Sequence, residues 1–435
     1  PITSSFWNER VQWRKSCLGF YDYWILLFFY CNITNYMKIL IIGYGITGKA
    51  LYDYFKKYQH DVYIYDEKKL KIKNYYSYAK LEKDLPLFDL GIKSPGIRFN
   101  NEKFLLIKSL CLKIMSELDF AFSKMEKSYV IGITGSNGKT SLATYLNHFI
   151  SKKKTTYLAG NIGKPLISLV DQIKKNDVVI LELSSFQIQD CENIYLDELF
   201  YTSLSPNHLN VYHYLKSYYA DKKRALLFIK SNKIYCLNNS KKIIGYPSFS
   251  IKKDFTKQIK KYLIGRYSIE YCNIAMNYCL NLGFIDEELL LNLKLLKPVE
   301  FRLNYLGQYH NLIFINDGKS STSSSSKYCF DSFKNKKRIL ILGGNHKSSS
   351  FNAIKVTKND EILIYGHDKN IINQQLSGRL FSTLEEIFLY LKDIKDKRYI
   401  LFSPGCDSHD QYSSYLERGK HFNQLVEKYF GDKHE

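Results

Sequence analysis

Short runs of apolar residues recur along the chain and alternate with stretches of helical periodicity. Runs typical of buried parallel strands occupy residues 38–42, 62–65, 129–133, 178–181, 312–315, 339–342, 362–365 and 400–402. Between them, apolar residues recur every three or four positions, as in Leu142, Leu146 and Phe149, a spacing that predicts amphipathic helices. Strands that alternate with helices predict an α/β fold built on parallel sheets.

The distribution of these runs predicts three α/β domains after an atypical N-terminal stretch. The predicted domains are a Rossmann-like domain over 37–125, a central P-loop ATPase-type domain over 126–297 and a C-terminal Rossmann-like domain over 298–435. Residues 1–36 hold all three tryptophans and an apolar run, 24–31, that is too short to span a bilayer. We interpret them as a non-native or disordered extension ahead of a true start at Met37, with a membrane-touching tail as the alternative.

The segment Gly132 to Ser141, GITGSNGKTS, lies between a predicted strand and a predicted helix. In such a turn successive backbone N–H groups surround phosphates, a lysine reaches the terminal phosphates and a hydroxyl binds Mg²⁺. The usual P-loop would have glycine where this chain has Ile133, so a glycine-rich turn without a ligand is the alternative. The context favours ATP binding by Gly135, Ser136, Asn137, Gly138, Lys139 and Thr140.

A second glycine motif, Gly43 to Gly48, joins the first predicted strand to a helix. Asp66 ends the next strand, and an acidic residue about 20 positions after the glycines suits a ribose or a base. This motif is weak by itself, and a dinucleotide-binding domain is the alternative. Because an ATP-type loop lies farther along the chain, we favour a UDP-sugar here, with the loop at residues 94–96 lining the same cleft.

Composition changes this picture little. The net charge is +21, but the lysines are spread over the whole length, which favours a compositional bias over a nucleic-acid footprint. A positive field would still attract an anionic substrate. The nine cysteines are odd in number and include no C-x-x-C pair, as in a reduced cytosolic protein. We therefore expect a cytoplasmic monomer with no nucleic-acid partner and no stable membrane association.

The motifs and their order resemble the Mur ligase family, the ATP-dependent enzymes that build the peptide stem of bacterial cell walls. The resemblance runs from Met37 to about Phe430 and is carried by the loop GxTGxNGKT, the block LELSSFQ at 181–187, the segment NHL at 207–209 followed by Lys222, and the segment from Ser403 to Gly419. It implies an amide-bond ligase that uses ATP and Mg²⁺. The reaction would add D-glutamate to UDP-N-acetylmuramoyl-L-alanine through an acyl phosphate, in peptidoglycan precursor synthesis.

The resemblance also implies roles for individual residues. The catalytic residues would be Lys139, Glu182, His208 and Lys222, and the Mg²⁺ ligands would be Thr140, Glu182, His208 and a carbamate on Lys222. ATP would further contact Asn273, Arg302 and Asp317. The UDP-substrate would contact Gly45, Ile46, Thr47, Asp66, Ser94 and Asn161. The D-glutamate carboxylates would be bound near Lys319, Ser321, Lys347, Ser408 and Tyr415.

The serine tract Ser320 to Ser326 would be a flexible linker on composition alone. Its position after residues 316–319, at the end of a predicted strand, favours a binding loop instead.

The chain departs from the family pattern at several positions near the expected ATP and Mg²⁺ sites. These are Asn207 for an acidic residue, Tyr267 and Ser268 for a His-Asn pair, Phe301 for a histidine, Gly318 for a serine and Gly405 for an alanine. A degraded homologue of low activity is therefore one alternative. Another Mur-type or folylpolyglutamate synthase-like ligase is a second, and a basic nucleic-acid-binding P-loop ATPase is a less favoured third.

Overall fold

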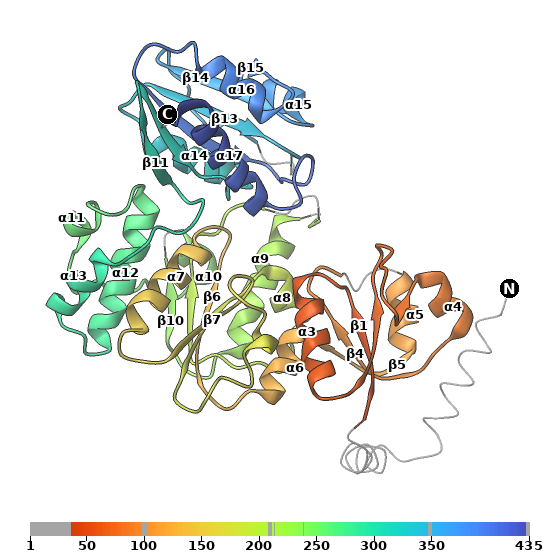
Figure 1. Cartoon of the computed structure of the whole chain (residues 1–435). Coiled ribbons are helices and arrows are strands. Elements are labelled where there is room, and N and C mark those ends of the chain that lie inside the picture. Colours follow the sequence, from red (N-terminus) through yellow and green to blue (C-terminus); the bar gives the residue numbers. More distant parts are fainter. Residues whose placement is uncertain are drawn as a thin grey trace. The chain divides into compact units, whose positions relative to one another are not determined.

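The structure is a computed structural model that describes residues 36–97, 102–207, 211–212, 214–237, 239–346 and 350–431. Two predicted site residues, His208 and Lys347, and the predicted extension up to residue 35 lie outside these ranges. The described residues form three sheets of mainly parallel strands with helices packed on them (Figure 1). The predicted α/β class is confirmed.

The first sheet has the strand order β3-β2-β1-β4-β5, and its neighbouring strands run parallel. Its strands are β1 (Lys38–Ile42), β2 (Asp61–Tyr65), β3 (Tyr75–Tyr76), β4 (Phe88–Lys93) and β5 (Cys111–Ser116). The accompanying helices are α3 (Ile46–Lys57), α4 (Tyr78–Asp84), α5 (Glu102–Ser109) and α6 (Glu117–Lys124). The apolar run 39–42 is fully buried, which explains why β1 lies at the centre.

The second sheet has the order β10-β9-β6-β8-β7. Its strands are β6 (Tyr129–Thr134), β7 (Thr156–Gly160), β8 (Val178–Glu182), β9 (Glu198–Tyr201) and β10 (Ile234–Cys236). Its helices include α7 (Lys139–Ile150), α8 (Ser185–Asp190), α9 (Leu215–Lys223), α10 (Ser240–Ile244), α11 (Thr256–Ile259), α12 (Arg266–Asn281) and α13 (Asp286–Lys294), with a 3₁₀ turn at Arg224–Phe228. A further 3₁₀ turn, Leu166–Ser168, packs against α3 and α6 of the first sheet. As the periodicity predicts, Leu142, Leu146 and Phe149 are buried in a core shared with α12.

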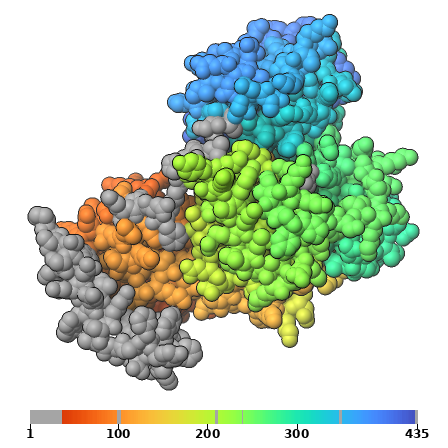
Figure 2. All heavy atoms as spheres, turned by 180° about the vertical axis from the view of Figure 1, so that it is seen from behind, coloured from red at the N-terminus to blue at the C-terminus, as the bar shows by residue number. Residues whose placement is uncertain are grey.

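The third sheet has the order β11-β12-β16-β13-β14-β15. Its strands are β11 (Asn304–Tyr309), β12 (Leu312–Asn316), β13 (Arg338–Gly343), β14 (Asp360–Tyr365), β15 (Arg379–Leu380) and β16 (Arg398–Gly405), with β11 antiparallel to β12. Its helices are α14 (Ser323–Asp331), α15 (Lys369–Asn373), α16 (Leu384–Leu391) and α17 (Tyr415–Phe430). In Figure 2 these residues, cyan to blue, form one compact body.

The sheets fall within the three predicted ranges, but the contacts divide the chain into two compact units. The first unit comprises the described residues up to Glu126 together with two later segments, Lys164–Gln172 and Asp190–Ile194. The second unit comprises the remainder, including the second and third sheets. The predicted domain boundaries stay a prediction, since sequence periodicity gave no sign that short middle segments pack with the first sheet.

The serine tract differs from the predicted binding loop because its second half is helical. Thr322 is the N-cap of α14, and its hydroxyl accepts a hydrogen bond from the Ser325 backbone N–H at 3.3 Å. Ser326 is fully buried, and its hydroxyl donates to the Ser403 carbonyl at 2.6 Å. Serine and threonine favour helix starts because their hydroxyls satisfy free backbone N–H groups. The loop prediction is therefore wrong for residues 323–326.

We predict that Arg338→Met destabilises the third sheet strongly. The guanidinium and Asp360 form a buried bidentate pair, with Nε to Oδ1 and Nη2 to Oδ2 both at 2.7 Å. Removing one partner of a buried pair leaves an uncompensated charge and costs about 3–5 kcal/mol. Denaturant unfolding would measure this loss. The matched change Lys327→Met breaks the exposed pair with Asp331 and should cost less than about 1 kcal/mol; equal losses in both variants would contradict the prediction.

Candidate active site

The loop between β6 and α7, residues 135–138, is the predicted phosphate loop. Its backbone conformations favour glycine. Gly135 and Gly138 have φ values of +145° and +89°. A Cβ on Gly138 would lie 2.3 Å from the Tyr271 ring, and one on Gly135 would lie 2.0 Å from the Thr202 hydroxyl oxygen. Only glycine fits at both positions. The strand, loop and helix that the motif requires are all present.

Lys139, the first residue of α7, folds back over this loop. Its Nζ donates to the carbonyls of Gly135 at 3.0 Å and Ser136 at 3.1 Å. Burial lowers the pKa of Lys139, the Arg302 charge lowers it further, and Glu182 opposes the change. A lysine in this position can exchange carbonyl partners for the oxygens of a terminal phosphate.

Glu182 ends β8 beside this helix start, as the sequence predicts. Its side chain is buried, and its two oxygens accept hydrogen bonds from the Thr140 hydroxyl and the Asn161 amide, both at 2.9 Å. A carboxylate beside a hydroxyl offers the hard oxygen ligands that Mg²⁺ prefers. Asn161 was predicted to contact the UDP-substrate, whereas here it holds the glutamate.

Lys222, on α9, is buried close to the same charges. Burial lowers its pKa well below the usual range, with Lys139 adding to the effect and Glu182 opposing it. The side chain lies over the Tyr218 ring, with Nζ 5.0 Å from the centroid. A buried neutral amine is the form that reacts with CO₂, so the environment suits the carbamate implied by the family resemblance.

Lys319, from the predicted third domain, lies close to the phosphate loop. Lys319 donates from Nζ to the Thr140 hydroxyl at 3.2 Å and lies 5.1 Å from the centroid of the Tyr415 ring. Burial lowers the pKa of Lys319 to about 8, with Arg302 contributing. The contact of Lys319 lies at the helix that follows the ATP loop, and its predicted role near D-glutamate stays a prediction.

Asp317 is buried and accepts hydrogen bonds from the Ser320 hydroxyl and, at 2.7 Å, the Ser403 hydroxyl. Burial raises its pKa, and the neighbouring Arg302 charge opposes that rise. This carboxyl therefore links the start of the serine tract to β16 and lies near the Arg302 charge.

A set of contacts that sequence analysis missed joins the phosphate loop to the serine tract. The Asn137 amide donates to the hydroxyls of Ser205 at 3.1 Å and Ser324 at 3.3 Å, and its oxygen accepts from Ser325 at 3.1 Å. The partners are separated by up to 188 positions in the sequence, so no local pattern could have indicated them.

A cleft opens next to these contacts. Its lining includes Asn137, Gly138, Tyr267, Ser268, Tyr271, Arg302, Asp317 and Tyr328. Tyr267 and Tyr328 meet edge to face with ring centroids 4.2 Å apart. Asn273 does not line this cleft, and its oxygen accepts from the Phe255 backbone N–H at 3.0 Å, so its predicted contact with adenine stays a prediction.

The first unit carries the predicted UDP-substrate residues. Asp66 accepts a hydrogen bond from the Tyr44 backbone N–H at 2.7 Å, and the Ser94 hydroxyl donates to the Gly43 carbonyl at 2.9 Å. Gly45 caps α3, and Ile46 is exposed, with Thr47 next along the helix. A cleft lies beside Asp66, lined by Tyr65, Glu67, Gly96, Ile97, Lys103, Phe104 and Ile107. The exposed start of α3 is a type of site that suits a phosphorylated ligand.

The remaining predicted D-glutamate residues lie on loops of the third sheet. Ser408 is buried and Tyr415 begins α17. Ser321 immediately precedes the Thr322 cap. Arg418, also buried, donates to the carbonyls of Cys406 at 3.0 Å and Gly318 at 3.1 Å, and so holds these loops together. The predictions for Ser321, Ser408 and Tyr415 remain predictions.

Among the described residues, no group of three His, Cys, Asp or Glu side chains could hold a metal by itself. The predicted ligand set differs from such a group, since it combines Glu182 with a hydroxyl, a carbamate and His208, which lies outside the described ranges. No helix in the described part of the chain has the length and apolar character needed to cross a membrane.

The chain is similar to known proteins over most of its length. Residues 133–276 match a family model described as the Mur ligase middle domain. The chain is 28% identical over 418 residues to a UDP-N-acetylmuramoylalanine--D-glutamate ligase of Francisella tularensis subsp. tularensis (strain WY96-3418), covering 92% of this chain and 98% of the relative. The relative of the same description in F. tularensis subsp. novicida (strain U112) is 28% identical over 419 residues, with the same coverage.

Solved structures show the same fold. A UDP-N-acetylmuramate-alanine ligase, MurC, of Thermotoga maritima matches with a TM-score of 0.58 and 15% identity, covering 90% of this chain and 99% of that one. MurF ligase of T. maritima, in complex with ADP, matches with a TM-score of 0.55 and 14% identity, covering 90% and 95%.

We predict that Gly138→Ala weakens ATP binding at least about tenfold, because the new Cβ would collide with Tyr271 and the residue would keep a positive φ. Calorimetric titration with ATP would measure the change. Gly245→Ala is the matched control, since Gly245 has a φ of +92° but no atom within 4 Å of its Cβ position. It should cost about 1 kcal/mol of stability and leave ATP affinity unchanged. Unchanged ATP affinity in Gly138→Ala would contradict the prediction.

Proposed function

We propose that the chain is a Mur ligase that joins D-glutamate to UDP-N-acetylmuramoyl-L-alanine while ATP is converted to ADP and phosphate, in peptidoglycan precursor synthesis. The observation that carries the proposal is the grouping of Lys139, Thr140 and Glu182 around the phosphate loop. The similarity to D-glutamate ligases over 92% of the chain supports the choice of amino acid.

The proposed reaction has two steps. A carboxylate oxygen of UDP-N-acetylmuramoyl-L-alanine attacks the γ-phosphorus of ATP, which gives an acyl phosphate and ADP. The D-glutamate amine then attacks the acyl carbon and loses a proton, and the tetrahedral intermediate expels phosphate to leave the amide. Phosphoryl transfer depends mainly on positioning and electrostatic stabilisation, so the residues around the loop carry most of the catalysis.

The charges of the site suit these steps. Lys139 would leave its carbonyl partners in the loop and bind the transferring phosphoryl group. Mg²⁺, when bound, would neutralise charge on the phosphates, and Thr140, Glu182 and a carbamate on Lys222 are the described groups that fit it. Thr140 and Glu182 already share a hydrogen bond, so they are held close enough to act on one ion.

The third domain would protect the acyl phosphate from water. Lys319 contacts Thr140, and Asn137 contacts Ser324 and Ser325, so residues from the start of α14 and the loop before it lie against the phosphate loop. Exclusion of water prevents hydrolysis of a reactive intermediate and strengthens the electrostatic interactions inside. D-glutamate would enter beside Ser321, Ser408 and Tyr415, with Lys347 as a further predicted carboxylate partner.

Two further proposals concern the setting of the enzyme. The UDP portion of the substrate would bind in the first unit at Asp66, Ser94 and the exposed start of α3. We keep the expectations that the protein acts as a monomer in the cytoplasm, without nucleic acid.

We predict ADP release that depends on D-glutamate. The assay contains ATP, Mg²⁺ and UDP-N-acetylmuramoyl-L-alanine, and compares D-glutamate with L-glutamate, L-lysine and no amino acid. Lys139→Ala should reduce turnover at least about a thousandfold while the protein stays folded, because a cation is lost where charge shifts in the transition state. Lys152→Ala, an exposed lysine just after α7, is the control and should retain full activity.

Substantial turnover by Lys139→Ala would overturn the assignment of this site. Release driven by L-glutamate on a folate substrate would favour the folylpolyglutamate synthase-like alternative. ATP hydrolysis stimulated only by RNA or DNA would favour the nucleic-acid-binding alternative.

We also predict that Lys222 carries a carbamate. Its pKa is lowered by burial, so the neutral amine required for reaction with CO₂ is available near neutral pH. Protein equilibrated with ¹³C-bicarbonate should show one carbamate carbon resonance that disappears in Lys222→Ala. Lys223→Ala changes the exposed neighbouring lysine and should keep the resonance. A wild-type protein that shows full activity and no carbamate signal would rule this assignment out.

A further inference from the structure

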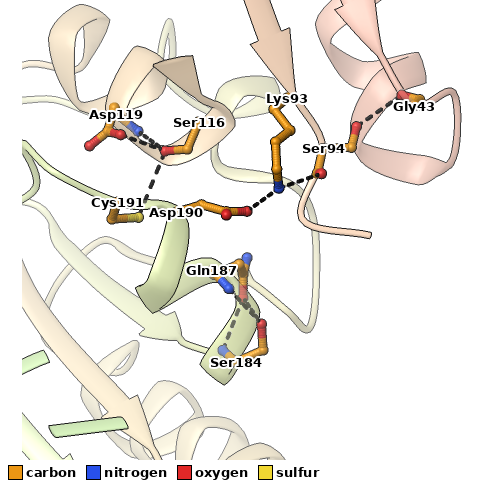
Figure 3. Close-up of polar contacts among 9 residues, drawn as sticks. All are labelled: Gly43, Lys93, Ser94, Ser116, Asp119, Ser184, Gln187, Asp190 and Cys191. Carbon is orange, nitrogen blue, oxygen red and sulfur yellow. Dashed lines mark hydrogen bonds and ion pairs between the residues drawn. The ribbon is translucent and has the colours of Figure 1, made fainter. Parts of the chain in front are cut away.

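The first unit contains a buried ion pair that the proposed chemistry does not use. Lys93 is the last residue of β4 and Asp190 the last residue of α8, and Figure 3 shows their side chains pointing toward each other. The exposed fractions of these side chains are 1% and 4%. Lys93 Nζ also donates to the Ser94 carbonyl at 3.3 Å. Neither residue belongs to a motif that sequence analysis selected.

A buried ion pair is a costly way to stabilise a fold. Removing two charges from water requires several kcal/mol per ion, and apolar residues of similar size often stabilise a protein as well or better. Burial lowers the pKa of Lys93, and the Asp190 carboxylate opposes this by favouring the charged ammonium. A role in fixing geometry therefore explains the pair better than a role in stability alone.

On one side the pair fixes the loop that begins with Ser94. The ammonium holds the carbonyl of this residue, while the Ser94 hydroxyl donates to the Gly43 carbonyl at 2.9 Å. Gly43 has a φ of +93°, and a Cβ there would lie 3.1 Å from the Ser94 Cβ and 3.0 Å from the Ile97 side chain. Lys93 thus sets the distance between the two loops assigned to the UDP-substrate.

On the other side the pair fixes the end of a short capped helix. The Gln187 oxygen accepts from the Ser184 backbone N–H at 3.0 Å, and the Ser184 hydroxyl accepts from the Gln187 N–H at 3.2 Å, so α8 begins in a fixed position (Figure 3). After Asp190 the chain is again held, because Asp119 accepts from the backbone N–H groups of Glu192 at 3.0 Å and Asn193 at 2.7 Å.

Together these contacts make Asp190 an immobile anchor for Lys93. The carboxylate stands at the junction of α8 and the segment that Asp119 holds, so the ammonium cannot shift without losing its partner. Because Lys93 is next to Ser94 in the chain, the position of the ammonium determines where the loop carbonyl lies.

We propose that Lys93 and Asp190 are positioning residues that hold the loop at residues 94–96 against the Gly43 loop in the geometry that binds the UDP-substrate. This inference rests on the proposed function, because it concerns the same substrate. The pair acts through Ser94 and does not contact the reacting atoms. Displacement of a binding loop by about 1 Å is enough to weaken binding strongly.

The test compares steady-state kinetics and direct binding. Lys93→Met and Asp190→Asn should each raise the KM for UDP-N-acetylmuramoyl-L-alanine and its Kd in calorimetry about tenfold, with the KM for ATP changed less than about twofold. The double variant Lys93→Met/Asp190→Leu should show the same rise rather than the product of two rises, since one pair is lost in each case. Its apolar replacement keeps the protein folded even if a single change does not.

Two control variants separate positioning from general destabilisation. Arg338→Met breaks the buried pair with Asp360 in the third sheet and should lower stability without changing the KM for the UDP-substrate. Lys57→Met breaks the exposed pair with Asp171 in the first unit, where the lysine is 61% exposed, and should change neither quantity. All kinetics are measured at a temperature where unfolding curves show each variant folded.

Normal affinity for the UDP-substrate in folded Lys93→Met/Asp190→Leu would overturn the inference, and so would an equal rise of KM in Arg338→Met. Both outcomes leave the proposed function intact, because the wild-type enzyme still binds this substrate and releases ADP with D-glutamate. A folded wild-type protein that binds no UDP-substrate in calorimetry would instead refute the proposed function and the inference together.

Discussion

The site depends on one electrostatic constraint, which is that several cationic groups are buried around the Glu182 carboxylate. Lys139, Lys222 and Lys319 all have pKa values lowered by burial, and Glu182 opposes each shift, with Asp221 also opposing that of Lys222 and Glu300 that of Lys319. Such a grouping is unfavourable until anions enter it. The phosphates of ATP and a carbamate on Lys222 would supply that negative charge. The positive φ at Gly138 and the contact of Lys319 with Thr140 are then the means by which the chain surrounds the anions closely enough.

Sequence analysis predicted those parts of this arrangement that depend on neighbouring residues. Apolar runs located the central strands because a strand buried on both faces has few polar positions. Glu182 was placed correctly at the end of β8, since the run before it is continuous. The phosphate loop was recognised because its glycines, lysine and threonine lie within a few positions of one another. Short edge strands such as β10 and β15, and the antiparallel β11, gave no comparable pattern.

Contacts between distant positions were not predictable in this way. Asn137 meets Ser325 across 188 positions, and Lys93 meets Asp190 across 97. The same limit explains the differences at single residues. Asn273 was assigned from its place in a family pattern, but its hydrogen bond to Phe255 depends on how a separate segment folds back onto α12. The serine tract was misjudged because composition gives the average behaviour of serine, whereas helix capping and burial against Ser403 depend on the tertiary structure.

Two departures from the family pattern, Gly405 and Phe301, are closely packed against their neighbours. Gly405 has a φ of +69°, and a Cβ there would lie 2.6 Å from the Ser326 hydroxyl oxygen. An alanine at this position would therefore collide with Ser326. Phe301 is buried and has a φ of +57°, which is a strained conformation for a non-glycine residue. Its ring packs against Gly419, where an added Cβ would lie 2.6 Å from the ring. Strain of this kind persists only where surrounding contacts enforce it. Here it lies immediately before Arg302, which lines the cleft beside the phosphate loop. The contacts around Phe301 therefore hold the backbone that leads into Arg302, a residue predicted to contact ATP.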